Sequence, residues 1–494
     1  MYSMPLNELL SVVSIENELN FANEESLISE LSIDSRKVSS GTLFIAYPGT
    51  TADGRNYIVE AQAAGATAVL FDSDDYQLPD TISIPAYAVK DLQHKVGILA
   101  NQFYQQPSAE MQVFGVTGTN GKTTCCYLLT QALTALGMQS VMIGTIGVGP
   151  INQLSTSTHT TPDAISVHRL LASWRDQGIT QVCMEVSSHA LDQGRVSGVQ
   201  FFCTLFTNLS HDHLDYHGDM AAYRAAKQRL FTDYSSELVI TNADDETGAG
   251  LIDIAQSDFI ASYGLKNGDV SCHDLSLNQN GMSFTVEANQ IDFDVNTKLI
   301  GQVNIPNVLM LVTTLLSLSI TVEDIQKVVS NLEAAPGRME LYTSNGKPSV
   351  VVDYAHTPDA LEKALASVDS HCEGKIWCVF GCGGDRDKTK RPLMGAVAHR
   401  LSSYVIVTND NPRSEPAESI ASDIVAGIES SENSPFVKVI LDRSEAIRYA
   451  ISEASSDDWV LVAGKGHETT QQIDDKFHEF SDRHHVSQYL GLAA

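Results

Sequence analysis

The sequence predicts an α/β protein built from three domains. At 494 residues, the chain has enough length for about three domains. From about residue 110 onward, β-prone apolar runs alternate with stretches of helical spacing, which favours mainly parallel sheets. Breaks rich in Pro, Gly or Gln at 105–108 and 334–337 divide the chain. We therefore expect a small α/β domain over 1–108, a central parallel-sheet domain over 109–335 and a Rossmann-like α/β domain over 336–494.

The first domain is predicted from short β-like runs separated by polar turns. Strand candidates are 41–48 and 66–71, and the segment 57–65 between them has a helical pattern. This composition indicates a small α/β fold but does not indicate a function.

The central domain is predicted from five strands that alternate with helices. The strand candidates are 111–116, 140–146, 180–186, 200–208 and 237–242. Such alternation favours a mainly parallel sheet with helices on both faces.

A glycine loop follows the first of these strands. It comprises Gly118, Thr119, Asn120, Gly121, Lys122, Thr123 and Thr124, and apolar residues at helical spacing follow it. Backbone N–H groups of such a loop and the helix dipole attract phosphate, a lysine reaches the outer phosphates, and a hydroxyl such as Thr123 can hold Mg²⁺. Val116 stands where the strict P-loop pattern has glycine, so an ordinary strand-to-helix turn is the alternative.

Polar residues near this loop suggest a metal site. Glu185 ends an apolar strand, where a carboxylate suits Mg²⁺ or is simply an edge residue. The segment 208–218 is the densest polar cluster of the chain and contains His213. Zinc fits its ligand types, but no cysteine accompanies it, and the phosphate loop favours magnesium. A solvated loop with incidental histidines is the alternative.

Lys227 lies on the apolar face of a predicted helix. Tyr223, Ala226, Leu230 and Phe231 share that face by their spacing. A buried lysine loses its charge readily and is then a reactive amine, which can take up carbon dioxide as a carbamate. The alternative is a lysine whose head reaches water.

The third domain is predicted from four β-like runs that each end in a polar cluster. The strands are 349–353, 376–380, 404–408 and 459–462. Because ligands bind at the carboxyl ends of strands in open α/β sheets, we expect the four clusters to form one crevice. Arg413 in the third cluster suits bidentate capture of a carboxylate.

Further candidates lie near the end of the central domain and at the start of the third domain. Asn304 and Asn307 precede an apolar helix and can read a purine edge or serve as turn and capping residues. Arg338 can clamp a transferring phosphoryl group or lie on the surface.

Composition limits the possible partners. Charged residues make up 19% and apolar residues 43%, as in ordinary globular proteins. The net charge of −30 argues against non-specific binding of nucleic acid or lipid. No apolar run is long enough for a membrane span, the N-terminus lacks a signal-peptide pattern, and the eight scattered cysteines indicate free thiols. We expect a cytoplasmic protein, and a monomer.

Taken together, these clusters resemble the Mur ligase family over essentially the whole chain. The family writes its loop as Gly-Thr-Asn-Gly-Lys-Thr, which Gly118 to Thr123 reproduces despite Val116. The resemblance implies ATP on Gly118 to Thr124, and two Mg²⁺ ions whose protein ligands are Thr123, Glu185, His213 and a carbamylated Lys227. Lys122, Lys227, His213 and Arg338 are the implied catalytic residues. It also implies ATP contacts from Asn304, Asn307, Asp353 and His356.

The resemblance further implies where the other substrates bind. The UDP-linked muramoyl dipeptide is expected at Ile33, Ser35, Thr50, Thr51, Ala52, Thr160, Thr161, Ser187, Gln193 and Arg195. The motif Asp410-Asn411-Pro412-Arg413 is similar to that of members that add meso-diaminopimelate, whose extra carboxylate Arg413 can pair. Arg386, Gly464 and Glu468 match further positions for this amino acid.

The implied activity is ATP-dependent amide bond formation through an acyl phosphate. One alternative is folylpolyglutamate synthetase, which shares the loop but not the first domain or the Asp-Asn-Pro-Arg motif. Another is a nucleotide-binding protein without catalysis, against which Lys122, Glu185, His213 and Lys227 argue.

Overall fold

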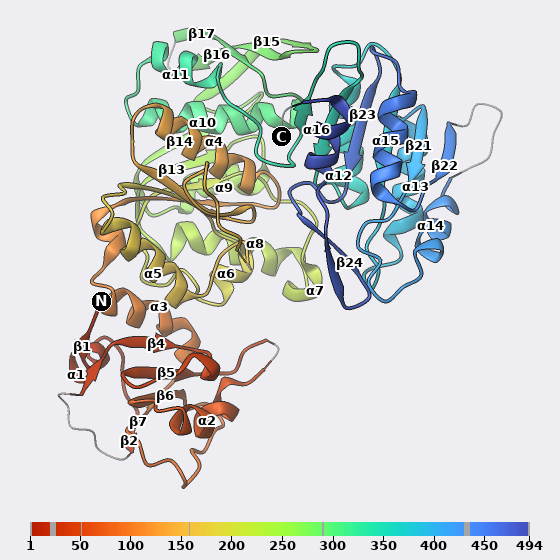
Figure 1. The fold of residues 1–494 in the computed structure, drawn as a ribbon. Coiled ribbons are helices and arrows are strands. Elements are labelled where there is room, and N and C mark those ends of the chain that lie inside the picture. The colour runs from red at the N-terminus through yellow and green to blue at the C-terminus, as the bar shows by residue number, and fades with distance from the viewer. Residues whose placement is uncertain are drawn as a thin grey trace. The chain divides into compact units, whose positions relative to one another are not determined.

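The structure is a computed structural model that describes residues 2–19, 26–50, 52–157, 159–288, 291–428 and 435–492. The chain divides into two compact units, residues 1–261 and 262–494 (Figure 1). Both contain parallel sheets with helices between successive strands, so the α/β prediction is confirmed. The three-domain boundaries stay a prediction. Within the described ranges, no helix has the length and apolar character that crossing a membrane requires.

The first unit opens with a five-stranded sheet in the order β2-β7-β6-β5-β4. The two predicted strands and the helix between them are present as β5 (Thr42–Ala46), β6 (Ala68–Asp72) and α2 (Ile58–Ala63). Four strands run parallel and β2 is antiparallel. The remaining elements are β1 (Met4–Pro5), α1 (Leu6–Leu10), β2 (Asn17–Leu19), β3 (Leu27–Ile28), β4 (Glu30–Ser32), η1 (Ser35–Lys37), η2 (Gly54–Tyr57), β7 (Ala86–Val89), α3 (Leu92–Phe103) and η3 (Pro107–Glu110).

A second sheet of this unit has β8 (Gln112–Thr117) at its centre. β11 (Gln181–Glu185) and β12 (Phe201–Phe206) flank β8 in parallel. Since Glu185 pairs with Val116, that carboxylate lies at the edge of the sheet where the glycine loop begins. All five predicted strands are present; the others are β9 (Ser140–Gly144) and β13 (Ser236–Asn242), with β10 (Gly147–Gly149) antiparallel at the edge and β14 (Ser257–Tyr263) next along the chain.

Alternating apolar residues pack this sheet against helices. Val113 and Val182 face a core that includes Val167 and Leu171 of α5. The residues that follow them, Phe114 and Cys183, are equally buried and point to the opposite face. The helices are α4 (Lys122–Ala135), α5 (Ala164–Arg175), α6 (Ser188–Asp192), α7 (Leu214–His217), α8 (Met220–Thr232) and α9 (Glu246–Ile254).

The second unit begins with an antiparallel meander that the sequence reading missed. The expectation of alternating strands and helices up to residue 335 is wrong between 270 and 297. There β15 (Val270–Asn278), β16 (Gly281–Ala288) and β17 (Ile291–Thr297) pair antiparallel. The signal was the alternation of buried and more exposed residues along β16 and the two-residue turn Gln279-Asn280 before it. Next come η4 (Gln302–Asn304), α10 (Ile305–Ser317) and α11 (Val322–Val329).

The rest of this unit is a six-stranded sheet in the order β18-β19-β23-β20-β21-β22. The four predicted strands are present as β19 (Ser349–Asp353), β20 (Ile376–Phe380), β21 (Tyr404–Val407) and β23 (Trp459–Ala463), all parallel. The others are β18 (Glu340–Tyr342) and β22 (Phe436–Val439), with the separate hairpin β24 (Thr470–Ile473) and β25 (Lys476–Glu479).

Both faces of this sheet are covered, which explains its continuous apolar strands. Val350 and Val352 face the helices α15 (Arg443–Glu453) and α16 (Asp482–Leu490). Val351 faces α12 (Pro358–Asp369), α13 (Lys390–Leu401) and α14 (Ala417–Val425) (Figure 1). The polar segments after the strands are thereby gathered at one edge.

Candidate active site

The glycine loop lies between β8 and the start of α4, as the sequence predicted. Gly118 and Gly121 have positive φ angles of 146° and 87°. A Cβ atom at Gly118 would lie 1.9 Å from Oγ1 of Thr207, so a larger residue does not fit there. The Lys122 Nζ donates to the carbonyl oxygens of Gly118 (2.8 Å) and Thr119 (2.9 Å). The lysine therefore lies along the loop.

The polar segment that follows β12 holds this loop in place. The Thr119 N–H donates to the carbonyl of Asn208, and the Asn120 N–H donates to the Asn208 Oδ1. Thr207 Oγ1 donates to the Asn120 carbonyl at 2.6 Å. The polar segment after β12 thus supports the loop from one side.

Glu185 lies beside the first turn of α4 with a fully buried side chain. Its Oε2 accepts from the hydroxyls of Thr123 (2.9 Å) and Thr145 (3.2 Å), and its Oε1 accepts from the Thr145 N–H (2.7 Å). A buried carboxylate next to a threonine hydroxyl is a donor set of hard oxygens that suits Mg²⁺. Sequence reasoning missed Thr145, for which no motif gave a signal.

Lys227 is buried, which decides between the two readings of its helical position. It is 1% exposed, and its Nζ donates to the Gly118 carbonyl at 2.7 Å and lies 4.5 Å from the Tyr223 ring centroid. Burial, together with the nearby Lys122 ammonium, lowers the pKa of Lys227 well below its ordinary value. The alternative of a lysine reaching water is wrong, and the amine adjoins the phosphate loop.

His213 starts α7 with a left-handed backbone (φ 51°) and belongs to a group of aromatic side chains. The centroid of its ring lies 4.9 Å from that of His189 and 6.1 Å from that of Tyr223. Burial lowers the pKa of His213, an effect that Lys122 and Lys227 reinforce and Asp212 opposes. In the described part of the chain, no group of three or more His, Cys, Asp or Glu side chains is arranged to hold a metal ion.

The residues expected at the UDP-linked substrate fall into a connected group and a separate loop. Arg195 donates from Nη1 to the Thr161 carbonyl and from Nε and Nη2 to Gln193 Oε1. Thr161 Oγ1 donates to the Glu185 carbonyl (2.8 Å) and lies 3.4 Å from the Ser187 hydroxyl. The Thr160 hydroxyl, 3.0 Å from that of Thr145, completes the group next to the candidate metal ligands.

The loop residues lie on the five-stranded part of the unit. Ser35 is buried, Ile33 is half-buried, and Thr50 and Ala52 are exposed. Thr51 lies outside the described residues. A cavity of about 390 Å³ lies between Thr50 and Gln193 and brings both groups together; its lining is Pro48, Gly49, Thr50, Gln93, His94, Asp192, Gln193, Tyr216 and Arg229.

In the second unit, Arg338 and Asp353 lie on neighbouring segments. The Asp353 carboxylate accepts from the N–H groups of Met339 and Ala355 (both 2.8 Å). Burial raises the pKa of Asp353, and Arg338 opposes that rise. The Arg338 guanidinium lies 4.3 Å from the Tyr354 ring centroid, and its buried Nε has no hydrogen-bond partner among the described residues. An orphaned guanidinium N–H suits an anionic ligand.

The other expected nucleotide contacts differ in exposure. The Asn304 Nδ2 donates to the Ile300 carbonyl, and the Asn307 Nδ2 donates to Asn304 Oδ1. Both asparagines are buried and support the start of α10. His356 is exposed, and its Nδ1 lies 2.8 Å from the Tyr354 carbonyl. Their roles toward a nucleotide stay predictions.

The polar segments after the four strands come together, as the topology predicted. The Gly464 N–H donates to the Asp353 carbonyl, and the Gly384 N–H donates to the Asn411 carbonyl. The Asn411 Nδ2 donates to Glu468 Oε2 at 3.0 Å. A Cβ atom at Gly464 would lie 2.6 Å from Asp410 Oδ2, which places that carboxylate against the glycine. These residues form the C-terminal cluster.

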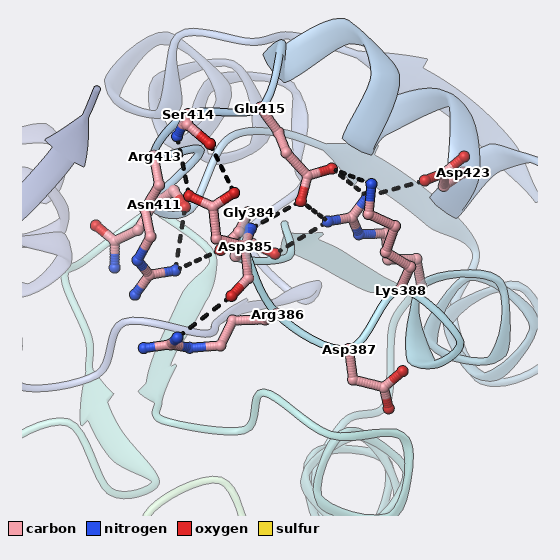
Figure 2. Close-up of polar contacts among 12 residues, drawn as sticks. Gly384, Asp385, Arg386, Asp387, Lys388, Asn411, Arg413, Ser414, Glu415 and Asp423 are labelled. Atoms are coloured by element: carbon pink, nitrogen blue, oxygen red, sulfur yellow. Dashed lines mark hydrogen bonds and ion pairs between the residues drawn. The ribbon is translucent and has the colours of Figure 1, made fainter. Parts of the chain in front are cut away.

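Arg413 lies beside Asn411 and reaches toward Gly384 of this cluster (Figure 2). Its backbone is left-handed (φ 52°), and its Nη1 donates to the Gly384 carbonyl at 2.8 Å. The guanidinium is half-buried, and its Nε and Nη2 bond to none of the described residues, which leaves them for a carboxylate. Arg386 is exposed and donates to the Asp385 carbonyl. Lys465, a buried cation in this cluster, was missed, although its Gly-Lys-Gly setting after β23 was a signal.

Comparison with known proteins identifies the protein family to which this chain belongs. Residues 27–104 match the model described as Mur ligase family, catalytic domain; residues 116–315 match the Mur ligase middle domain; and residues 337–466 match the Mur ligase, glutamate ligase domain. The chain belongs to the Mur ligase family.

The similarity to individual relatives points to one kind of ligase within the family. The chain is 44% identical over 463 residues to a UDP-N-acetylmuramoyl-L-alanyl-D-glutamate–2,6-diaminopimelate ligase of Coxiella burnetii, covering 92% of this chain and 94% of the relative. It is 42% identical over 492 residues to the ligase of the same name from Pseudomonas putida, covering 98% and 97%. A solved structure of a ligase with this name is similar with a TM-score of 0.74 and 33% identity, covering 99% of both chains.

Proposed function

We propose that this protein is the ATP-dependent ligase that joins meso-2,6-diaminopimelate to UDP-N-acetylmuramoyl-L-alanyl-D-glutamate in the synthesis of peptidoglycan precursors. The observation that carries the proposal is the identity of 42–44%, over nearly the full length, to two ligases of that name. The position of Arg413 in the C-terminal cluster supports the assignment of the amino acid.

The first chemical step is phosphoryl transfer. An oxygen of the D-glutamate γ-carboxylate attacks the γ-phosphorus of ATP, the bond to the bridging oxygen breaks, and ADP leaves. The Lys122 ammonium and the N–H groups of the glycine loop offset the negative charge on the phosphates. We assign Gly118 to Thr124 to ATP, and Arg338 to the charge of the transferring group because its Nε is orphaned.

In the second step, an amine of diaminopimelate attacks the carbonyl carbon of the acyl phosphate. The tetrahedral intermediate collapses with release of phosphate, and the nitrogen loses a proton to leave an amide. The amine must be neutral to attack. A site that excludes water and orients the amine toward the carbonyl carbon supplies much of the rate acceleration. We assign the amino acid to the C-terminal cluster and the UDP-linked dipeptide to the group around Arg195 and the cavity beside Thr50.

The residues present fit Mg²⁺. Thr123 and Glu185 would hold one ion, since a buried carboxylate and a hydroxyl already share a hydrogen bond there. His213 and a carbamate on Lys227 would serve a second. When bound, magnesium would act as a Lewis acid and offset the negative charge of the phosphates. The buried Lys227 amine has the lowered pKa that carbamate formation requires.

The test is an acceptor panel with the purified protein. ATP, Mg²⁺ and the UDP-linked dipeptide are mixed with single amino acids, and ADP and the amide product are measured. We expect product with meso-diaminopimelate at far lower concentrations than with L-lysine. Efficient use of L-lysine with diaminopimelate ignored would refute the assignment, and extension of folate with glutamate would favour the folylpolyglutamate synthetase alternative. A cytoplasmic location and a monomeric state belong to the same proposal.

A further inference from the structure

Lys465 is a buried cation beneath the C-terminal cluster. It is 0% exposed, and its Nζ donates to Asn411 Oδ1 at 3.1 Å and to Glu468 Oε2 at 2.9 Å. Burying an ammonium is costly unless its partners are well placed. The lysine therefore fixes two side chains that the sequence had assigned to the amino acid.

The Asn411 amide is committed to the protein. Its Oδ1 accepts from the Lys465 Nζ and from the Gln472 N–H at 2.9 Å, and its Nδ2 donates to Glu468 Oε2. Both acceptor positions of the amide oxygen are thereby used. Asn411 thus links Lys465 to the hairpin that contains Gln472.

The same hairpin holds the backbone of Arg413. The Arg413 N–H donates to the Gln472 carbonyl at 3.2 Å, and the Asp474 N–H donates to the Arg413 carbonyl at 2.9 Å. Arg413 has the left-handed φ of 52°, which is strained for a residue with a side chain and needs such support. The orientation of its guanidinium (Figure 2) depends on this support.

Glu468 differs from Asn411 in keeping an open side. Its side chain is 32% exposed, and the hydrogen bonds from Lys465 and Asn411 both fall on Oε2. Among the described residues none donates to Oε1, which leaves this oxygen for an ammonium group of an incoming amino acid. A glutamate held on one oxygen and open on the other is suited to orient such a ligand.

We propose that Lys465 is a positioning residue for the amino-acid substrate. It fixes the Glu468 carboxylate directly, and it fixes Arg413 through Asn411 and the hairpin β24–β25. The Glu468 carboxylate, which can accept from an ammonium group, and the Arg413 guanidinium, which can donate to a carboxylate, are thereby held at a fixed separation. This arrangement suits an amino acid with a second charged end. This inference rests on the proposed function, because it takes diaminopimelate as the ligand.

The test compares the full-length protein with Lys465→Met, which keeps the length of the side chain and removes its charge. We expect the KM for diaminopimelate to rise about 10- to 100-fold, because misplacement of a binding group by about an ångström has effects of this size. The kcat and the KM values for ATP and the UDP-linked dipeptide should change far less. Lys347→Met, at an exposed lysine between β18 and β19, is the matched control.

Stability is measured by thermal unfolding in parallel. If Lys465→Met does not fold, Lys465→Arg, which retains the buried charge, takes its place, and a raised KM with a near-normal kcat supports the inference. A folded variant with an unchanged KM, or with only a lower kcat, overturns it.

The wild-type arm separates this inference from the proposed function. If the wild type uses another amino acid instead, the proposed function fails and the KM for that amino acid decides the role of Lys465. If the wild type uses diaminopimelate and Lys465→Met binds it normally, only the inference fails. A wild type that uses no amino acid overturns both.

Discussion

Replacing Arg413 with alanine should weaken the use of diaminopimelate selectively. The guanidinium is tethered through Nη1 to the Gly384 carbonyl at 2.8 Å, so little side-chain entropy remains to be lost when a carboxylate binds. Hydrogen bonds to a charged partner contribute about 1.5–3 kcal/mol, and partial exposure of Arg413 favours the lower part of that range. A loss of about 2 kcal/mol corresponds to a roughly 30-fold fall in kcat/KM.

The assay measures ADP release and amide product with diaminopimelate and, at high concentration, with L-lysine. L-Lysine lacks the second carboxylate, so its kcat/KM should change by less than about threefold. Arg448→Ala, at an exposed arginine of α15, is the matched control and should resemble the wild type. An equal loss for both amino acids, or full retention of diaminopimelate use, would refute the role given to Arg413.

Three further predictions concern buried charges. Lys227→Ala should abolish most activity. With ¹³C-labelled carbon dioxide, only the wild type should give a carbamate NMR signal. Because burial lowers the pKa of Lys227, its amine stays neutral at a lower pH than that of exposed lysines, and the carbamate signal should persist to that lower pH. Full activity of the variant would contradict this. Glu185→Gln should raise the Mg²⁺ concentration needed for half-maximal activity at least about tenfold and lower stability by about 1–3 kcal/mol, because its new amide N–H groups face the donors of Thr123 and Thr145; an unchanged Mg²⁺ titration would count against the site. Asp482→Asn should destabilise the protein by about 3–5 kcal/mol, since it leaves the fully buried Arg443 unpaired; denaturant unfolding measures this, and a change below about 1 kcal/mol would show that the pair contributes little.

The strands were predictable where burial on both faces required continuous apolar runs. In β19, Val350 and Val351 point to different layers of helices, and both are fully buried. The strand limits followed because each run ends in a polar cluster. The meander β15–β17 was missed because many of its side chains are exposed, so its apolar signal is weaker and has a period of two.

The candidate site was predictable by residue type more than by orientation. Lys227 stood on an apolar face by spacing alone, yet only the packing of α8 shows that its amine is 1% exposed. Asn411 and Asn304 were assigned to ligands, but their amides also bond within the protein. Sequence places a polar group near a strand or helix end, whereas its partner depends on segments far away in the chain, such as Gln472 for Asn411.

The charges around Lys227 bear on its chemical state. A protonated amine there would be desolvated and would also be repelled by Lys122, and these are the two effects that lower its pKa most. Addition of carbon dioxide converts the neutral amine to an anion, so the same Lys122 charge becomes attractive. Burial disfavours either charged form, but a neighbouring cation disfavours only the ammonium. The Lys122 ammonium next to the buried Lys227 thus favours the carbamate over the ammonium.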